Sequence, residues 1–433
     1  MSMKPALPRS TTRWQAFCFT SLFCSLILGS SLSARAADAS PGQQPANPWQ
    51  PAWDRDYRDF VEALLIHQDS CFVAGGGKVL QLDLRDGRQQ HAFTIPGAII
   101  LHLHAVDHVL FVLYRSNQGD VAAEGRGDLQ AAAAAAAKYT AFQATNGPGV
   151  MLSLDLSSHK KLWESRGWSA EGIPVVWNNR VILNRSPGGV SALEVATGKR
   201  LWQSDSLYQV GPGSSEMGIE LNSLGTDLTA AGFEGGKSVW HTSIPKFKAR
   251  SVDIVLRQAT GKDNYYLLMQ LPEDKPVYEA RKIDTVLFAG KKADGRPLWK
   301  VRYPDRKPVC PPMVLNGKVI WIACGVPQSG SGGVYALSES DGHPVWSRTL
   351  KVDPTEVPAL FAEENEIVLV SQEQNNVAAI LGLDAESGNL KWRYVGAANA
   401  RFSGAFADFP NLACSARYLV YFEELKIRAL KRK

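Results

Sequence analysis

The sequence predicts an all-β protein, an eight-bladed β-propeller that is closed between its two ends. Three observations support this fold: an eleven-residue block that recurs and ends in Trp, a near-constant spacing of the copies, and the length of the chain. About 380 residues remain after the N-terminal segments. A folded part of this length exceeds a single ordinary core and favours several domains or a closed repeat architecture.

The recurring block is most complete at residues 192–202, which read ALEVATGKRLW. A weaker copy at residues 81–91 has His91 in place of Trp, and a truncated copy at residues 427–430 closes the chain. The structural Trp residues of the repeat are Trp163, Trp202, Trp299, Trp346 and Trp392.

Each block predicts a β-hairpin. Alternating apolar residues precede a pair such as Asp86-Gly87 or Thr197-Gly198, where Gly accepts the positive φ of a tight turn. The Trp falls on the returning strand, where its flat surface can pack against a neighbouring copy. An upstream strand signal, such as Val319–Ile322, accompanies each copy. We therefore expect about four antiparallel strands per unit, with the hairpin on the inner side.

The spacing of the copies gives the number of units. Trp299 and Trp346 are 47 residues apart, and Trp202 and Trp299 are 97 apart, which is two periods. A degenerate unit is expected at Ser238–His241, between the latter two. The eight hairpin positions begin near residues 79, 150, 190, 238, 286, 333, 379 and 427. Seven blades is the alternative, should residues 219–245 be irregular.

The last copy lacks its returning strand because the chain ends at Lys433. Residues 49–59 (WQPAWDRDYRD) are available before the first unit begins. We predict that they supply the missing strand, so that the ring closes between the N- and C-terminal strands and leaves no long exposed edge.

The block A-x-D-x-x-T-G-x-x-x-W, seen over residues 60–433, resembles the PQQ-like repeat of the quinoprotein alcohol dehydrogenase-like propeller superfamily. That superfamily includes quinoprotein dehydrogenases and non-catalytic members, among them the propeller of the outer-membrane β-barrel assembly machinery. The resemblance implies the fold but does not choose between these functions.

Residues 1–36 predict a signal peptide. Three basic residues precede an apolar stretch, and Ala34-x-Ala36 fits the signal-peptidase rule, so we expect cleavage after Ala36. A retained anchor is the alternative, but the apolar part at 16–28 is shorter than the roughly 20 residues of a spanning helix. A lipoprotein is not expected, because Leu22-Phe23 before Cys24 are not the small residues of a lipobox.

Residues 37–52 form a polar linker, and residues 53–433 form the propeller. Loss of residues 1–36 removes four basic side chains and no acidic one, so the formal net charge falls from +5 to about +1. A near-neutral chain argues against a nucleic-acid partner. We expect a periplasmic or secreted, monomeric propeller with no membrane span.

An insertion at residues 116–149 interrupts the second unit between two of its strands. Asp128 is a suitable helix N-cap, and Ala131–Ala137 have high helix propensity. A tolerated surface insertion is the preferred interpretation, and a lid or partner-contacting arm is the alternative.

Four Cys residues remain after cleavage, and an exported protein permits disulfides. Cys310 and Cys324 flank a predicted outer hairpin, whereas Cys71 and Cys414 lie in the first and last units, which are neighbours in a closed ring. These are two candidate disulfides, with free buried thiols as the alternative. The resemblance to quinoprotein alcohol dehydrogenases would imply an adjacent Cys pair, which the sequence lacks.

No local motif assigns a catalytic residue, a metal site or a cofactor site. A quinone site would need carboxylate and amide oxygens around a calcium ion, with an Asp as base, and no such trio stands out. His102 and His104 share one side of a strand-like run, where a metal is conceivable, but ordinary polar positions at a blade edge are preferred. No cofactor is therefore expected, and PQQ with calcium is the alternative.

The sequence therefore favours an exported, non-enzymatic propeller that binds a protein, peptide or other ligand on one face in the bacterial envelope. The alternative is a PQQ-dependent quinoprotein oxidoreductase, or a protein that binds PQQ without turnover. A polysaccharide-binding propeller is compatible with the many Trp and Tyr residues, although most Trp are already assigned to the repeat.

Overall fold

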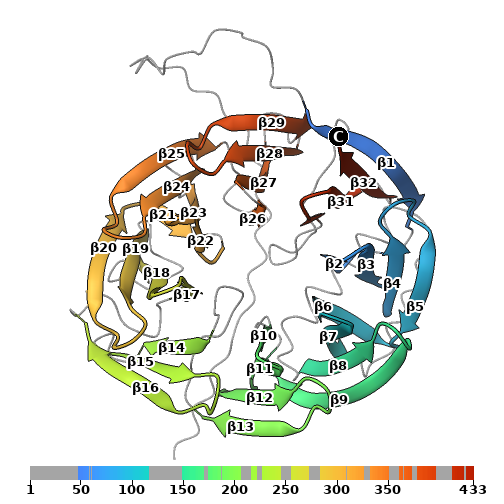
Figure 1. Ribbon diagram of the computed structural model, residues 1–433, viewed down its shortest axis with the longest axis horizontal. Helices are drawn as coiled ribbons and strands as arrows, with labels where there is room; N and C mark the ends of the chain where they lie inside the picture. The colour runs from blue at the N-terminus through green and yellow to red at the C-terminus, as the bar shows by residue number, and fades with distance from the viewer. Residues whose placement is uncertain are drawn as a thin grey trace, which may run out of the picture. The chain divides into compact units, whose positions relative to one another are not determined.

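The computed structural model describes a propeller made of β-strands within the compact unit Pro45–Lys433. Eight antiparallel sheets form its blades (Figure 1). The predicted eight-bladed fold is confirmed, and the alternative of seven blades is not. The described residues are 47–57, 59, 61–116, 149–169, 174–186, 188–205, 216–221, 227–244, 255–272, 283–308, 310–325, 332–350, 360–363, 365–372, 378–395, 412–423 and 426–433.

Blades 1 to 3 each contain four strands that pair in chain order, the first near the axis and the fourth at the rim (Figure 1). Blade 1 contains β2 (Ala63–His67), β3 (Ser70–Gly75), β4 (Lys78–Asp83) and β5 (Gln89–Thr94). Blade 2 contains β6 (Ala98–Val106), β7 (Val109–Ser116), β8 (Gly149–Asp155) and β9 (Lys160–Trp168). Blade 3 contains β10 (Val175–Trp177), β11 (Arg180–Asn184), β12 (Val190–Glu194) and β13 (Arg200–Ser204).

Blades 4 to 7 continue the ring. The described part of blade 4 has three strands, β14 (Met217–Leu221), β15 (Asp227–Gly232) and β16 (Ser238–Ser243). Blade 5 contains β17 (Val255–Thr260), β18 (Asn264–Pro272), β19 (Ile283–Lys291) and β20 (Pro297–Tyr303). Blade 6 contains β21 (Arg306–Pro308), β22 (Met313–Leu315), β23 (Lys318–Gly325), β24 (Gly332–Ser338) and β25 (Pro344–Leu350). Blade 7 contains β26 (Leu360–Glu363), β27 (Glu366–Gln372), β28 (Ala378–Asp384) and β29 (Leu390–Val395).

Blade 8 joins the two ends of the described chain. It contains β30 (Leu412–Cys414), β31 (Tyr418–Glu423), β32 (Lys426–Arg432) and, at the rim, β1 (Trp49–Asp56). Strands β1 and β32 pair antiparallel from Trp49 opposite Arg432 to Asp56 opposite Lys426. The N-terminal segment thus supplies the closing strand, as predicted. Strand β1 begins at Trp49, within the segment 37–52 that the sequence analysis assigns to the linker.

The structure corrects two details of the predicted repeat. The hairpins form the third and fourth strands of their blades and therefore lie at the rim, not on the inner side (Figure 1). The predicted start at residue 238 falls on the outer strand β16, whereas the other seven starts fall on third strands. The third strand of blade 4 is β15, and Trp240 on β16 marks the returning strand.

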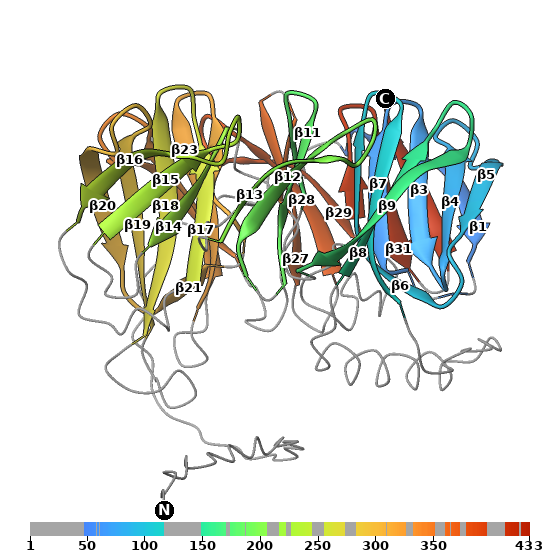
Figure 2. The same ribbon diagram turned by 90° about the horizontal axis from the view of Figure 1, so that it is seen from below.

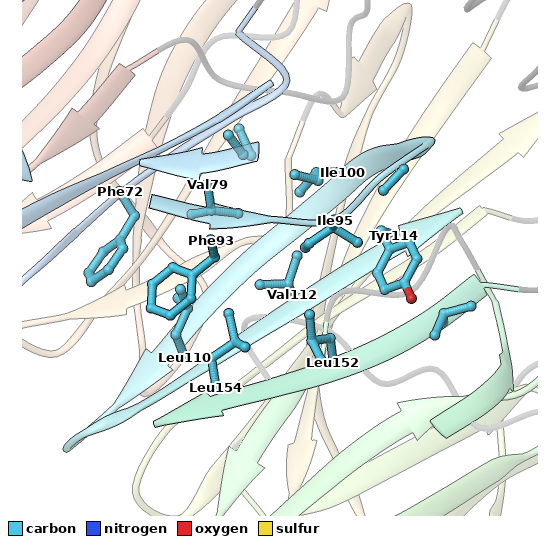
Figure 3. Packing of buried hydrophobic residues seen from close by; sticks show 14 residues of the cluster. Phe72, Val79, Phe93, Ile95, Ile100, Leu110, Val112, Tyr114, Leu152 and Leu154 are labelled. Carbon is cyan, nitrogen blue, oxygen red and sulfur yellow. The ribbon is translucent and has the colours of Figure 1, made fainter. Parts of the chain in front are cut away.

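Each blade interface is formed mainly by apolar side chains. Between blades 1 and 2, buried residues of β3, β4 and β5 pack against β6, β7 and β8. Phe72, Phe93, Leu110, Val112 and Leu154 lie together in this core (Figure 3). Among the described residues, neighbouring sheets do not continue into one another, although the backbones of blades 2 and 3 bond at the bridge between Trp168 and Arg185. Apolar packing and side-chain hydrogen bonds supply the other contacts between blades.

A Trp on the outer strand of most blades docks on the turn of the next blade. The Trp163 Nε1 donates to the carbonyl oxygen of Val195 at 2.7 Å, and its ring covers Gly198. A Cβ at Gly198, whose φ is 68°, would lie only 2.6 Å from that ring, so the contact requires Gly. The same docking occurs for Trp53 on Gly87, Trp202 on Gly236, Trp240 on Gly295, Trp299 on Gly342 and Trp346 on Gly388.

A β-bulge immediately precedes the docking position in all eight blades. In blade 3, Trp202 pairs with Ala192 and Arg200 pairs with Leu193, which leaves Leu201 as the extra residue. A bulge re-aims the side chain that follows it, here toward the next blade. The eight bulge residues are Ala52, Gln90, Leu162, Leu201, Val239, Leu298, Val345 and Lys391.

Two interfaces depart from Trp docking. Between blades 1 and 2, the ring of His91 stacks on His159, with 4.0 Å between centroids and 5° between planes. His159 has a φ of 56° at the position that Gly occupies in the other turns. Between blades 7 and 8, Trp392 has no turn to receive it, because β32 ends the chain.

A buried ion-pair network takes the place of the missing turn at this last interface. The Trp392 Nε1 donates to Glu366 Oε1 at 2.8 Å, and Arg432 Nη2 donates to Glu366 Oε2 at 2.8 Å. The Glu366 side chain is only 3% exposed. Lys391 lies 3.4 Å from the same carboxylate, and the Arg432 guanidinium lies over the ring of Trp49. Glu366 thereby connects blade 7 to the C-terminal strand.

The Trp–Gly contact predicts a steric penalty at Gly342. Gly342→Ala would place a Cβ 2.6 Å from the Trp299 ring, whereas Gly317, at a similar φ of 70°, has no atom within 4 Å of that position. We expect Gly317→Ala to lower the free energy of unfolding by about 1 kcal/mol, the cost of a left-handed residue. Gly342→Ala should lower it by about 2 kcal/mol more. Urea unfolding of both variants measures the difference, and equal losses would contradict the docking role.

The ion pairs at Glu366 predict a second stability effect. We expect Glu366→Gln to lower the free energy of unfolding by about 2 kcal/mol, because it leaves the partly buried Arg432 without its counter-charge. Asp54→Asn is the control, because Asp54 pairs with Lys426 of the same strand β32 at 3.2 Å but is 59% exposed. That change should stay within about 0.5 kcal/mol. Comparable losses in urea unfolding would rule out the special role of Glu366.

Candidate binding surface

One face of the propeller consists of short, tightly bonded turns. Strands 1 and 2 of a blade, and strands 3 and 4, are joined on this face, which lies at the top in Figure 2. The two connections bond to each other, as in Leu84 N to Asp69 O at 3.0 Å and Val195 N to Asn179 O at 3.1 Å. This face, the turn face, is therefore a rigid surface.

The carboxylates of the turn face are used to close its turns. The Asp83 carboxylate accepts from the backbone and guanidinium of Arg85, which lowers its pKa to about 2. The Asp384 carboxylate accepts from the hydroxyl and amide of Ser387, and these bonds hold its pKa below the usual value. Such acids stabilise turns.

Two segments singled out in the sequence fall wholly or mostly outside the described residues. The predicted insertion 116–149 lies between β7 and β8 of blade 2, as expected, but residues 117–148 lie outside the described residues. The predicted signal peptide 1–36 also lies outside them. In the part that is described, no helix is long and apolar enough to span a membrane.

The strands nearest the axis present mainly aliphatic side chains. Leu64 on β2, Val176 on β10 and Met313 on β22 are partly exposed, and the polar exceptions include His67, His102, His104, Glu220 and Arg257. Among the described residues, no three His, Cys, Asp or Glu side chains are grouped as metal ligands would be.

Two buried polar side chains near the axis satisfy backbone groups of neighbouring blades. The Glu62 Oε2 accepts from the amide of Ile100 at 2.8 Å, and burial, with a smaller contribution from Asp59, raises the pKa of Glu62 to about 8. The Gln258 side chain accepts from Ile219 N and donates to Met217 O, both at 3.1 Å. Both contacts connect one blade to the next.

The two His residues singled out in the sequence lie on β6. Leu103 and Ala105 pack against blade 1, so His102 and His104 on the alternate positions face away from it. Burial lowers the pKa of His104, and His67 lowers it further. Their partial burial among packed strands fits polar positions at a blade edge.

The Cys residues occupy different parts of the ring. Cys71 on β3 is a free, fully buried thiol, and burial raises its pKa to about 12. The Cys414 thiol, on β30, donates to the carbonyl oxygen of Ser415. A disulfide between these two stays a prediction.

The second Cys pair lies nearer the axis than predicted. Cys310 precedes β22, and Cys324 lies in β23, so the two flank an inner hairpin of blade 6 rather than an outer one. The side chain of Cys324 lies outside the described residues. Their disulfide also stays a prediction.

The rim carries the most exposed large apolar side chains of the described residues. All five lie on outer strands: Leu162 (41%), Leu201 (45%), Val239 (56%), Val345 (46%) and Val395 (42%). Four of them are bulge residues, directly before a docking Trp. We call Leu162, Leu201 and Val239, on the consecutive blades 2, 3 and 4, the aliphatic rim.

No role was predicted for the rim residues, although a pattern in the sequence marks their position. The residue before the repeat Trp is Leu or Val in the copies ending at Trp163, Trp202, Trp299 and Trp346. Strand alternation alone cannot show that this residue is exposed, because the bulge breaks the alternation at that point.

Comparisons with solved structures show the same fold. A computationally designed protein, Ika8, has a TM-score of 0.58 at 11% identity and covers 89% of this chain and 100% of its own. BamB from Moraxella catarrhalis has a TM-score of 0.57 at 11% identity, covering 88% and 99%. The quinohemoprotein alcohol dehydrogenase ADHIIG from Pseudomonas putida HK5 has a TM-score of 0.52 at 12% identity, covering 90% and 77%. At these identities the likeness concerns the fold alone.

The sequence itself matches a family model over most of its length. No curated protein matches the chain. The model described as outer membrane protein assembly factor BamB matches residues 115–263 and 284–433, which together are more than half of the chain. The PQQ-like repeats, the eight-bladed ring and this match agree, and the chain belongs to the family of outer membrane protein assembly factor BamB.

Proposed function

We propose that this protein is an exported, non-enzymatic propeller that binds a protein partner in the bacterial envelope and acts there as a scaffold. The observation that carries the proposal is that the most exposed large apolar side chains of the described residues all lie on outer strands of the ring. Membership of a family described as an outer membrane protein assembly factor supports the same role.

The construction of the ring suits a scaffold. Trp docking, the bonded turns and the closing strand β1 hold the described blades in one arrangement. A surface presented by such a framework loses little conformational freedom when a partner binds, which favours affinity. The carboxylates described above close turns or bond to backbone groups, so the described residues assign no acid–base pair.

Export is the first testable part of this proposal. We expect the protein isolated from the periplasm or the medium to begin at Ala37, because signal peptidase should cleave after Ala36. N-terminal sequencing of the fractionated protein measures this. A cytoplasmic protein that keeps residues 1–36 would contradict export.

Partner binding is the second testable part. Chemical cross-linking in intact envelopes, followed by mass spectrometry, should give a reproducible complex of this chain with an outer-membrane assembly protein. Deletion of the gene should lower the folded fraction of outer-membrane β-barrel proteins on semi-native gels. Normal β-barrel assembly together with the absence of any complex would contradict the scaffold role.

A cofactor titration separates the scaffold from the quinoprotein alternative. We expect PQQ and calcium, added to the purified protein, to give no stoichiometric absorbance change and no dye reduction with an alcohol or sugar. Stoichiometric binding with turnover would overturn the proposed function. Binding without turnover would instead assign PQQ as a ligand of the propeller.

A further inference from the structure

We propose that the stack of His91 on His159 is a pH-sensitive contact within the ring. It connects the outer strand of blade 1 to a turn of blade 2 while both imidazoles are neutral, and it separates when acidification charges them. This inference goes beyond the proposed function and does not depend on it, because it concerns how the ring itself responds to pH.

The stack occupies the position at which most blade interfaces have a Trp docked on Gly. His91 follows the bulge of β5, as Trp202 follows the bulge of β13. His159 lies in the turn between β8 and β9, where the corresponding turn of blade 3 has Gly198. An indole carries no charge at physiological pH, whereas an imidazole gains one near about pH 6.5. The stack can therefore respond to pH in a way that Trp docking cannot.

The geometry of the contact is a face-to-face stack of two rings. Their centroids are 4.0 Å apart and their planes differ by 5°. Phe93 lies against both rings, with its centroid 4.6 Å from that of His91 and 6.1 Å from that of His159. Neutral rings at this distance gain dispersion energy and exclude water from each other. Two imidazolium ions at the same distance would repel each other, and Phe93 offers them no counter-charge.

The surroundings of His91 disfavour its charged form. Burial lowers the pKa of His91, and the neighbouring His159 lowers it further. The folded ring therefore holds a proton on His91 less readily than the unfolded chain, in which His titrates at about pH 6.5. The stabilisation by the stack is fully present above that pH, and it is lost as the pH falls from there to the folded-state pKa.

The charged groups of blade 2 beside the stack do not offset a charge on it. The Asp155 carboxylate accepts from two backbone amides of its own turn, at 3.0 and 2.6 Å, and lies 3.6 Å from His108 Nε2. Lys160, the residue after His159, is a cation that opposes protonation of its neighbour. The acidic side chain of this turn is thus already held by its backbone and by His108.

The charged groups of the adjoining turn of blade 1 have partners of their own. The Asp83 carboxylate accepts from the guanidinium of Arg85, and Asp86 pairs with Arg88 at 3.4 Å. Glu62 also connects blades 1 and 2, but it does so near the axis, through a backbone amide of blade 2. Its titration is common to every variant compared below, so it cancels in the differences between them.

Replacement of the stack by Trp docking tests the inference. The double variant His91→Trp, His159→Gly should restore the contact seen in the other blades, with the Leu156 carbonyl at the place of the Val195 acceptor in blade 3. The melting temperature of the purified full chain is measured at about pH 7.5 and about pH 5.0, on either side of the usual His pKa. Between these values it should fall by about 2 °C more in the wild type than in the double variant.

A second variant provides a direct measurement on the imidazole itself. His159→Asn removes one ring and keeps a residue type that accepts the left-handed φ of 56° at this position. NMR titration of the His91 ring should then give a higher pKa than in the wild type, because His159 no longer opposes its charge. His343→Gln is the matched control, because His343 is exposed in the corresponding turn of blade 6. It should leave both measurements unchanged.

Two results would overturn the inference: an equal fall in melting temperature for the wild type and the double variant, or a His91 pKa that His159→Asn leaves unchanged. If the double variant does not fold, the NMR titration decides alone. The proposed function fails separately, since a loss of export or of the envelope complex would not alter the titration of His91 in the purified protein.

Discussion

The ring depends on one interaction, the docking of an outer-strand Trp on the Gly of the next blade. It joins blades whose sheets do not continue into one another in the described part of the chain, and it combines a hydrogen bond of 2.7 to 3.2 Å with a contact that only Gly permits. Because the donor is on one blade and the acceptor on the next, the interaction sets both the distance and the angle between them. The bulge before each Trp directs the indole to that position.

The exception between blades 7 and 8 shows how the ring accommodates its own ends. Docking needs a turn between the third and fourth strands, and blade 8 has none, since its fourth strand is β1 and its third ends the chain. Glu366 therefore holds Trp392 and Arg432 instead. Trp53 on β1 nevertheless docks on Gly87, so the N-terminal strand carries the contact from blade 8 to blade 1.

The same architecture separates structural from functional positions. The Trp, its Gly and the turn carboxylates are committed to the fold, and the bulge residue between them is not. A repeat that requires a particular residue at one position and accepts different residues at the next can vary its surface without changing its core. In blades 2, 3 and 4 this position carries Leu162, Leu201 and Val239, which are 41%, 45% and 56% exposed.

The sequence alone determined the number of blades and the strand–turn–strand unit, because both are encoded by residues close together in the chain. It also indicated the source of the closing strand, because the last copy of the repeat lacks its returning strand and residues 49–59 precede the first unit. Alternation, Asp-Gly or Thr-Gly turns and Trp spacing are local patterns. The tertiary structure decided which side of the blade the hairpin occupies, which group the Trp392 indole bonds and which residues of the rim are exposed. These depend on contacts between residues 31 to 52 positions apart, such as Trp53 with Leu84 and Trp240 with Lys292, and on a bulge that breaks the alternation. Such contacts arise only when the blades pack together.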